Sequence, residues 1–360
     1  MTLPWLLFAL PAGALADRVD RRAAMLTANV ARAAAVAVLA VAVALGLESS
    51  VAAIWVLYLV ALLLGTAETV HDTCAQSILP QVVPRDRLPR ANGRLIAAEL
   101  TANEFVGPPL GGLLVAAGAA LAFATPAALW AAAVAALLLL RGRFSVPRRE
   151  PTTLRADVAE GLGYLWRHRL LRTLATMTGL FNLATNATFA VFVLYAVGPR
   201  SAMHLTEAAY GLLFATIAAG SLVGAVLADP IIRRLGRSRS LFLGILGGVG
   251  TVGVAAVTTS PLVIAAAFLV GGVTNALWNV VAVSLRQRIT PDRILGRINS
   301  SYRLVAWGTR PLGAAAGGLL GQLLGLRAVF AIAAALILAT LLGMTQVTDA
   351  AIAGAEQDDR

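Results

Sequence analysis

Apolar stretches close to the length of a membrane span recur along the whole chain and constrain its fold more than any other feature. Eleven such segments fall near 3–16, 23–46, 51–74, 94–117, 120–140, 171–195, 207–228, 240–258, 261–284, 298–322 and 326–346. A helix needs about 20 apolar residues to cross ~30 Å of hydrocarbon. Ten segments reach that length, whereas Leu3 to Ala16 covers only ~21 Å. The chain is 59% hydrophobic and 13% charged, so we predict an all-α polytopic membrane protein.

The arginines predict the orientation of these segments. All 29 basic residues are arginine, and they gather in alternate loops, while the intervening loops hold only Arg200 and Arg327. By the positive-inside rule, the arginine-rich loops and the C-terminus are cytoplasmic, in the inner (cytoplasmic) membrane of a bacterium. The net charge of +11 therefore serves to set the membrane topology, and contact with anionic lipids of the bilayer is a secondary role. We expect no nucleic-acid partner.

Several kinds of chemistry are absent from the sequence. Without lysine, the chain has neither a Walker A ATP site nor a Schiff-base residue. Cys74 is the single cysteine, and His71, His168 and His204 lack the spacing of a metal site. We therefore expect no enzyme, no cofactor and no metal. A membrane-embedded enzyme remains a distant alternative, because no nucleophile–base pair is visible.

A short hydrophilic hinge occurs twice. In the first copy Asp17 is followed at i+4 and i+5 by Arg21 and Arg22, and the second copy lies 212 residues later. Two further pairs of segments match at offsets of 202 to 207 residues. In the first pair, Asp86-Arg87-Leu88 matches Asp292-Arg293-Ile294, and the match continues with Arg90 and Arg297 and with Asn92 and Asn299. In the second pair, Pro109-Leu110-Gly111 matches Pro311-Leu312-Gly313. The three matches predict a parallel duplication.

The duplication predicts how the chain is divided. We expect an N-terminal helical bundle over 1–140, a cytoplasmic linker over 141–170, a six-helix bundle over 171–346 and an acidic cytoplasmic tail over 347–360. The repeat offset places the start of the first half about 37 residues before Met1. On this reasoning the first helix and part of the second are missing, so the N-terminal bundle is incomplete.

The linker itself contains an amphipathic pattern. Leu154, Val158 and Leu162 fall at helical spacing, and Thr152 or Thr153 is a candidate N-cap. The acidic residues Asp157 and Glu160 lie mostly on the other side. We expect this helix to lie on the inner membrane surface as a structural linker, with a regulatory role as the alternative.

The hinge resembles the signature G-x-L-A-D-R-x-G-R-R of the major facilitator superfamily, with Asp20 where glycine is usual. The stretches LPWLLFALPAGALADR, LPQVVPRDRLPRANG, GPPLGG and GLGYLWRHRLLRTL resemble the enterobactin-exporter-like and drug:proton antiporter-like branch of that superfamily. The resemblance covers nearly the whole chain. It implies twelve helices in two pseudo-symmetric six-helix bundles, alternating access, and export coupled to proton entry.

The resemblance also implies a gate at the hinge. Asp17 can accept hydrogen bonds from the N-terminus of a neighbouring helix and pair with an arginine, and breaking that contact would open the inner face. The alternative is that the arginines only fix topology. The predicted gating residues of the two copies are Gly13, Asp17, Arg18, Arg21, Arg22, Asp229, Arg233 and Arg234.

Gly107-Pro108-Pro109-Leu110-Gly111-Gly112 is similar to the end of a signature associated with antiporters, although Asn103 stands where that signature has a glycine. The alternative is a helix-packing motif, in which Pro108 kinks the helix and Gly107, Gly111 and Gly112 permit close contact.

Ionisable residues within the apolar segments are candidates for proton coupling, because burying a charge in lipid is costly. The candidates are Glu104, Glu68, Asp72 and Arg310. Glu104 lies ~15 Å past Arg94 along a helix, close to the midplane, and we expect it to pair with Arg310. As an alternative to a role in proton coupling, Asp72 and the neighbouring His71 lie at the membrane–water interface and are solvated there. We expect Arg32 and Arg303 to snorkel from positions nearer the helix ends.

Polar and aromatic residues on two helices of the second half are candidates for lining a substrate cavity. They are Asn182, Asn186, Asn275, Trp278 and Asn279. Hydrogen bonding between helices is an equally open role for the asparagines.

These observations predict a monomeric secondary transporter that exports a small hydrophobic or amphipathic compound, drug-like or siderophore-like, in exchange for protons. The alternative is a non-transporting remnant of such a transporter, because a missing helix would leave the cavity without one wall.

Overall fold

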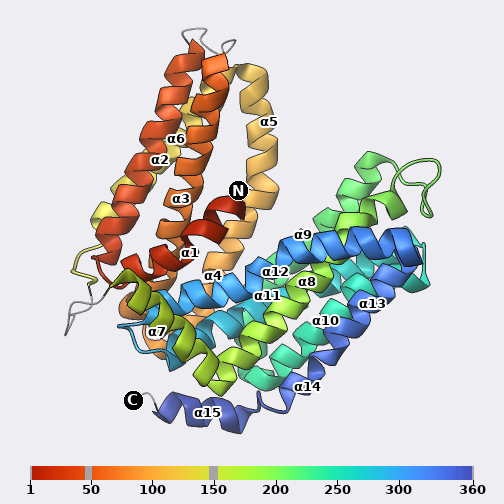
Figure 1. The fold of residues 1–360 in the computed structure, drawn as a ribbon. Helices are drawn as coiled ribbons and strands as arrows, with labels where there is room; N and C mark the ends of the chain where they lie inside the picture. The colour runs from red at the N-terminus through yellow and green to blue at the C-terminus, as the bar shows by residue number, and fades with distance from the viewer. Residues whose placement is uncertain (1, 45–50, 146–152, 359–360) are drawn as a thin grey trace. The chain divides into compact units, whose positions relative to one another are not determined.

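The computed structural model describes residues 2–44, 51–145 and 153–358, which fold into helices joined by short loops (Figure 1). The α-helices are α1 (Thr2–Ala16), α2 (Arg21–Ala44), α3 (Val51–Val82), α4 (Leu88–Leu100), α5 (Gly107–Ala117), α6 (Ala119–Leu139), α7 (Leu154–Arg167), α8 (Arg169–Ala196), α9 (Glu207–Leu235), α10 (Arg237–Val257), α11 (Pro261–Ile289), α12 (Leu295–Leu324), α13 (Leu326–Ala339), α14 (Leu341–Met344) and α15 (Asp349–Asp358). Extended pairing within the described residues is limited to one isolated bridge between Val197 and Leu205. The predicted all-α class is confirmed.

The predicted apolar segments all fall on helices, but the fourth is interrupted. Between α4 and α5 the chain forms a π-helical turn over Thr101–Val106. After Gly107, this turn is followed by Pro108 and Pro109. Because proline has no backbone N–H, carbonyl groups of the preceding turn lack their usual hydrogen-bond donors. Within the described residues, seven helices are long and apolar enough to cross a membrane by length and composition. The number of spans expected from the sequence remains a prediction.

Contacts between helices divide the chain into two compact units. Unit 1 comprises residues 1–84, 105–165 and 290–304, and unit 2 comprises residues 85–104, 166–289 and 305–360. Each unit contains segments from both sides of the 141–170 connection, so the contact units do not coincide with the bundles expected from the duplication. The predicted bundle boundaries remain predictions.

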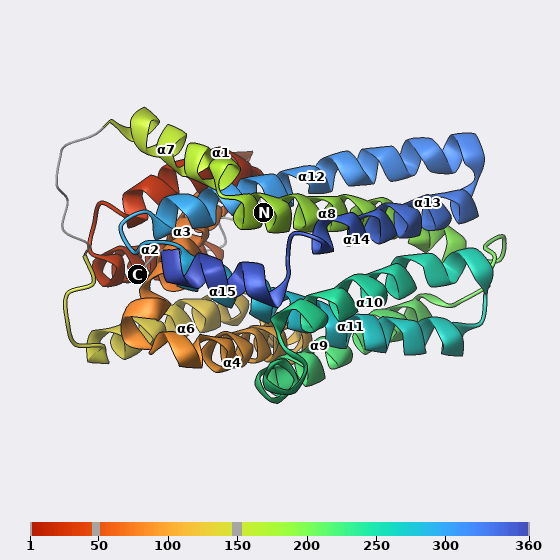
Figure 2. The same ribbon diagram turned by 90° about the horizontal axis from the view of Figure 1, so that it is seen from below.

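Within unit 1, α2 packs against α3 and α6, and α1 packs against α3 (Figure 1). Within unit 2, α11 packs against α9 and α10, and α13 packs against α8 and α10 (Figure 2). The core of unit 2 contains a cluster of aromatic rings with centroids 5.0 to 6.4 Å apart, in the range favoured by aromatic pairs. The cluster includes Phe189, Phe192, Tyr195, Tyr210, Phe214, Phe268 and Phe330.

Glycines at four-residue spacing bring helix backbones together in unit 2. On α9, a methyl group at Gly220 would lie 2.0 Å from the carbonyl oxygen of Leu269, and one at Gly224 would lie 2.3 Å from that of Val273. On α12, Gly313 and Gly317 approach carbonyl oxygens of α8 in the same way, each at 2.2 Å. Close contact through small residues is a main source of helix association in lipid, where the hydrophobic effect between helices is weak.

We expect Gly220→Ala to lower the free energy of unfolding by about 1–3 kcal/mol, because the added methyl group must push α9 away from α11. The matched control is Gly211→Ala on the same helix, where a methyl group would meet no atom within 4 Å. Thermal unfolding of the purified protein in one detergent compares the two variants. Equal melting temperatures would contradict close packing at Gly220.

Candidate functional site

The carboxylate of Asp17 binds the N-terminus of α12. Asp17 directly follows α1 and is only 5% exposed. Its Oδ1 accepts a hydrogen bond from the backbone N–H of Gly296 at 2.9 Å, and its Oδ2 accepts one from Arg297 at 3.0 Å. These donors belong to the first turn of α12, which has no helical acceptor for them, and the helix dipole favours a negative charge there. Asp17 thus caps a helix that begins 278 residues later in the chain.

Gly13 permits this contact because it lies directly against α12. A methyl group at Gly13 would stand 1.9 Å from Ser300 Oγ and 2.6 Å from the carbonyl oxygen of Gly296. On the opposite side, a methyl group at Gly296 would meet Asp17 Oδ1 at 2.7 Å. Larger residues at either position would separate α1 from α12 and lengthen the hydrogen bonds of Asp17.

Arg21 is fully buried and binds four groups from three segments of unit 1. Its guanidinium donates to Asp17 Oδ1 at 3.2 Å and to the carbonyl oxygens of Ala16, Ser77 and Asp292. Burial raises the pKa of Asp17 to about 6, because desolvation outweighs the opposing effects of Arg21 and of the backbone donors. At neutral pH this carboxyl group is still mostly ionised and therefore a strong hydrogen-bond acceptor.

The other two hinge arginines bind different elements. Arg18 Nη2 lies 2.6 Å from Asp157 Oδ2 on α7. Arg22 donates to the carbonyl oxygens of Leu137 and Leu138 in the last turn of α6, where helical carbonyls lack internal donors. Each arginine therefore has a structural partner in addition to any effect on topology.

Helix α7 is joined to this hinge by its acidic side. The Thr153 hydroxyl caps the helix by accepting from the N–H of Ala156, as the sequence predicted. Asp157 is fully buried between Arg18 and Arg297, whose Nη2 lies 3.2 Å from its Oδ1, and Glu160 also binds Arg297. The sequence placed Asp157 on the polar side of this helix, and basic partners from the hinge and α12 cover that side and bury it.

The second copy of the hinge forms a weaker contact in unit 2. Asp229 lies inside α9 and pairs with Arg233 of the same helix at 2.9 Å, while Arg233 and Arg234 are exposed. Among the hydrogen bonds of the described residues, none joins Asp229 to the N-terminus of α4. At the repeat offset of 207 residues, Pro89 occupies the position equivalent to Gly296. Because proline has no N–H, α4 lacks the donor that Gly296 supplies on α12.

Other contacts of the two copies correspond closely. Asn299 Nδ2 donates to Ser77 Oγ at 3.2 Å in unit 1, and Asn92 Nδ2 donates to Ser284 Oγ at 3.0 Å in unit 2. Both members of one pair lie 207 residues from their equivalents. A methyl group at Gly93 would also lie 2.6 Å from the carbonyl oxygen of Ala225, much as one at Gly13 would meet α12. The duplication seen in the sequence thus extends to its contacts.

The coupling candidates Glu68 and Asp72 lie one turn apart on α3. Arg303 Nη2 stands 4.0 Å from Asp72 Oδ2, and His71 Nδ1 stands 3.3 Å from Asp72 Oδ1. Arg32 of α2 interacts electrostatically with both carboxylates and has its guanidinium 5.9 Å from the Trp130 ring centre. We expected Arg32 to snorkel, but it is buried at 7% exposure, because these groups surround it.

The remaining candidates differ in how far the structure describes them. Glu104 lies in the π-helical turn, but its side chain is outside the described side chains, so its pairing with Arg310 remains untested. The guanidinium of Arg310 lies 4.5 Å from the Trp307 ring centre instead. A methyl group at Gly111 would meet nothing within 4 Å, so this glycine makes no close helix contact here. Gly107 is exposed, and the surroundings of Pro108 and Gly112 lie outside the described part of the structure.

The cavity candidates divide between packing and exposure. Asn182 Nδ2 donates to the carbonyl oxygen of Ala306 on α12, and Trp278 Nε1 donates to Thr178 Oγ1 on α8, so both join helices. Asn186 bonds within α8. Asn279 bonds Asn275 within α11 and is exposed, although its neighbours Trp278 and Val280 are buried.

Sequence comparisons agree with this architecture. A family model described as "Transmembrane secretion effector", from the major facilitator superfamily, matches residues 1–358. The chain belongs to the major facilitator superfamily. It is therefore a multi-pass membrane transporter by family, as the hinge motif predicted, and not an enzyme.

Its relatives in this superfamily include exporters. The multidrug efflux pump Tap of Mycobacterium tuberculosis is 29% identical over 338 residues, covering 91% of this chain and 78% of that protein. The enterobactin exporter EntS of Salmonella typhi is 27% identical over 317 residues, covering 87% of this chain and 73% of that protein.

Solved structures of the superfamily share the fold. A bacterial homologue of the iron transporter ferroportin in its outward-facing state has a TM-score of 0.69 at 19% identity, covering 96% of this chain and 87% of that chain. The human organic anion transporter MFSD10 has a TM-score of 0.75 at 15% identity, covering 95% and 81%.

We expect Asp157→Asn to lower the free energy of unfolding by about 3 kcal/mol, because it removes a fully buried negative charge that pairs with both Arg18 and Arg297. The control is Glu160→Gln, which removes a half-exposed carboxylate from the same helix and is expected to cost under ~1 kcal/mol. Thermal unfolding of both variants in one detergent measures the difference. A larger effect of Glu160→Gln would contradict the role given to Asp157.

Proposed function

We propose that the protein exports a small hydrophobic or amphipathic compound, drug-like or siderophore-like, by alternating access driven by proton entry. The observation that carries this proposal is the contact of Asp17 with the N-terminus of α12. It joins a hinge of the first half of the chain to a helix of the second half through polar bonds that water can replace. The names of the efflux relatives support export as the direction.

The strength of the Asp17 contact suits a reversible gate. A hydrogen bond to a charged group is worth about 1.5–3 kcal/mol, and water replaces it when the contact opens. Two such bonds, with the Arg21 and Arg297 ion pairs, stabilise one state by a few kcal/mol. Two conformations separated by that amount both remain accessible, which alternating access requires.

The acidic pair on α3 supports proton coupling. When both are ionised, Glu68 and Asp72 balance the charges of Arg32 and Arg303, which come from α2 and α12. A proton on either carboxylate leaves a net positive charge within an apolar segment of the chain. Since that state is costly in lipid, protonation favours a rearrangement of α3 relative to its basic partners.

The proposed substrate path uses the exposed polar face of α11. Asn279 and Asn275 present amide groups there, and Asn186 of α8 is a further candidate. Amides bind many neutral and amphipathic molecules, so they favour broad specificity over a single cargo. We further propose that the protein works as a monomer in the inner membrane, with its arginine-rich loops in the cytoplasm.

Asp17→Asn tests the gate, with Asp229→Asn as the matched control. Loss of the charge at Asp17 weakens two backbone hydrogen bonds, so we expect the buried residue Ser300, replaced by cysteine in a Cys74→Ser background, to react with maleimide about tenfold faster. Asp229→Asn is expected to change that rate less than about twofold, because Asp229 bonds only its own helix.

Export of fluorescent amphipathic dyes from cells is measured on the same two variants. We expect Asp17→Asn to impair export and Asp229→Asn to leave most of it. Equal effects of the two substitutions, on labelling and on export, would refute a special role for Asp17. Absence of export for every dye with the unmodified chain would favour the non-transporting alternative.

Glu68→Gln and Asp72→Asn test proton coupling, and Glu104→Gln tests the remaining candidate. In proteoliposomes we expect the two α3 variants to lose proton-driven accumulation of dye but to retain dye exchange, because exchange needs no net proton movement. Accumulation driven by a pH gradient and exchange without one are compared side by side. If only Glu104→Gln abolishes proton-driven accumulation while retaining dye exchange, proton coupling lies at Glu104 and not on α3.

A further inference from the structure

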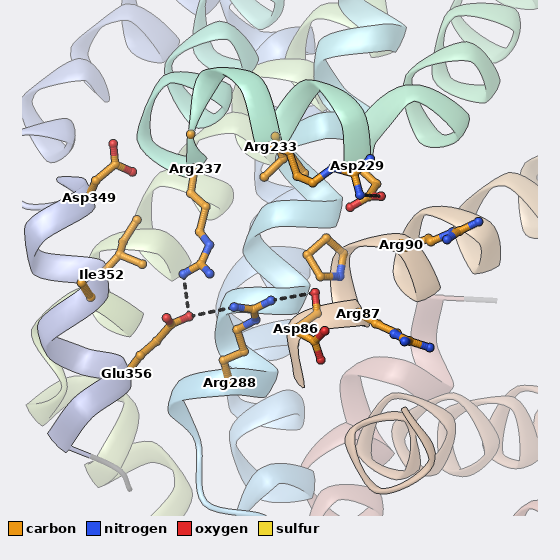
Figure 3. A pocket seen from close by; sticks show the side chains of 14 residues that line it. Asp86, Arg87, Arg90, Asp229, Arg233, Arg237, Arg288, Asp349, Ile352 and Glu356 are labelled. Carbon is orange, nitrogen blue, oxygen red and sulfur yellow. Dashed lines mark hydrogen bonds and ion pairs between the residues drawn. The ribbon is translucent and has the colours of Figure 1, made fainter. Parts of the chain in front are cut away.

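A cavity of about 780 Å³ lies in unit 2 among α4, α9, α11 and α15 and is rich in arginine (Figure 3). It is distinct from the Asp17 contact and from the carboxylates of α3. The arginines that line it are Arg87, Arg90, Arg233, Arg237 and Arg288. Arg87 and Arg90 come from the first half of the chain and the others from the second half, so an anion in this cavity can bind both.

Five arginines and four acidic residues line the cavity, so its net charge is small and positive. Three of the acidic residues have bonded partners, and the fourth, Asp86, interacts electrostatically with Arg288. Glu356 of α15 binds Arg237 at 2.5 Å and Arg288 at 3.4 Å, as Figure 3 shows. Asp349 accepts a hydrogen bond from the N–H of Ser238 at 3.1 Å. Asp229 pairs with Arg233, which leaves an excess of positive charge on the α4 side of the cavity.

This positive charge comes from Arg90 on α4 and from Arg87, the residue just before α4. Among the ion pairs of the described side chains, none involves Arg87 or Arg90, whose exposed side chains extend away from Arg288 in Figure 3. Arg288 also has a buried Nε with no hydrogen-bond partner in the structure. Guanidinium groups bind phosphate through paired, charge-assisted hydrogen bonds, so this lining suits a phosphate group.

A groove of about 400 Å³ continues from the charged cavity along α4 and α9 and shares Arg90, Asp229 and Arg233 with it. Arg94 adds a further positive charge to the groove. Its apolar lining consists of Ala97, Ala225, Val226 and Pro230, of which Val226 is 63% exposed. A soluble anion needs only the charged cavity, whereas a phospholipid needs a charged cavity that opens onto an apolar surface.

We propose that this cavity binds the headgroup phosphate of an anionic phospholipid, with an acyl chain along the groove between α4 and α9. Arg288 binds the phosphate, and the exposed side chains of Arg87 and Arg90 turn toward it when the lipid is bound. Glu356 competes with it for Arg288, so the C-terminal helix α15 limits the affinity for lipid. The proposal rests on the membrane location of the chain and not on its transport activity.

Such a lipid would strengthen the weaker of the two repeated contacts. Pro89 deprives α4 of the N–H that would correspond to that of Gly296, so Asp229 does not hold α4. A phosphate bound by Arg87 and Arg90 on one side and by Arg288 on the other links the same two segments. The lipid therefore favours the conformation in which α4 packs against α9 and α11.

The test measures the melting temperature of the purified full chain in detergent during titration with phosphatidylglycerol or phosphatidylcholine. We expect stabilisation by phosphatidylglycerol only. The double substitution R87Q/R90Q should weaken the apparent affinity about tenfold, since each arginine near a lipid surface contributes about 1 kcal/mol. The control R141Q/R143Q removes two exposed arginines of unit 1 and should leave the affinity unchanged. E356Q should raise the affinity about threefold, because it frees Arg288.

Three results would overturn the proposal. The first is equal stabilisation by the two lipids. The second is equal loss of affinity in R87Q/R90Q and R141Q/R143Q, which would indicate a general surface effect. The third is full stabilisation by glycerol phosphate without lipid, which would assign the cavity to a soluble anion. Far-UV circular dichroism of each variant before titration confirms that it is folded.

Discussion

The bond between the Asp17 carboxylate and the first turn of α12 is the interaction on which the rest of the hinge depends. Ile294, the residue before α12, has no side-chain acceptor, so the N–H groups of Gly296 and Arg297 require one from elsewhere. Arg21 positions Asp17 by binding three backbone carbonyls at once. The network is therefore strong in one conformation and easily replaced by water in another.

The two halves of the duplication use equivalent positions with unequal chemistry. Asn92 and Asn299 make the same hydrogen bond to a serine, which shows that the helices meet in equivalent ways. Because Pro89 stands where the other copy has Gly296, α4 lacks one N–H donor. Asp229 therefore cannot make the hydrogen bond that Asp17 makes to Gly296. The Asp17 contact depends on backbone donors of α12, whereas the contact of α4 with α9 depends on helix packing and side-chain charges.

The sequence predicted helices and the hinge motif well, because long apolar segments have few alternatives to a helix in lipid. It predicted that Asp17 meets a helix N-terminus but not which helix, since nothing local connects residue 17 with residue 296. The partners of Asp157 were missed for a similar reason. Its helical spacing placed it on a polar side, and only tertiary contacts show that this side faces Arg18 and Arg297. The absence of an N-capping residue before α12 was a usable signal for an external cap.

In the proposed gating mechanism, the unequal contacts imply that the two copies of the hinge respond to different conditions. Opening the Asp17 contact exposes backbone N–H groups that only water or another carboxylate can satisfy, so its cost is set by the protein itself. Opening the α4 contact separates arginines, among them Arg87, Arg90 and Arg288, whose repulsion depends on the anions present. The first contact responds to pH, because its charged acceptor is lost as the pH falls through the Asp17 pKa of about 6. The second contact is where salt, lipid or the acidic helix α15 can change the balance between conformations. In the proposed mechanism, the loss of one backbone donor makes the second copy of the hinge the one that responds to anions.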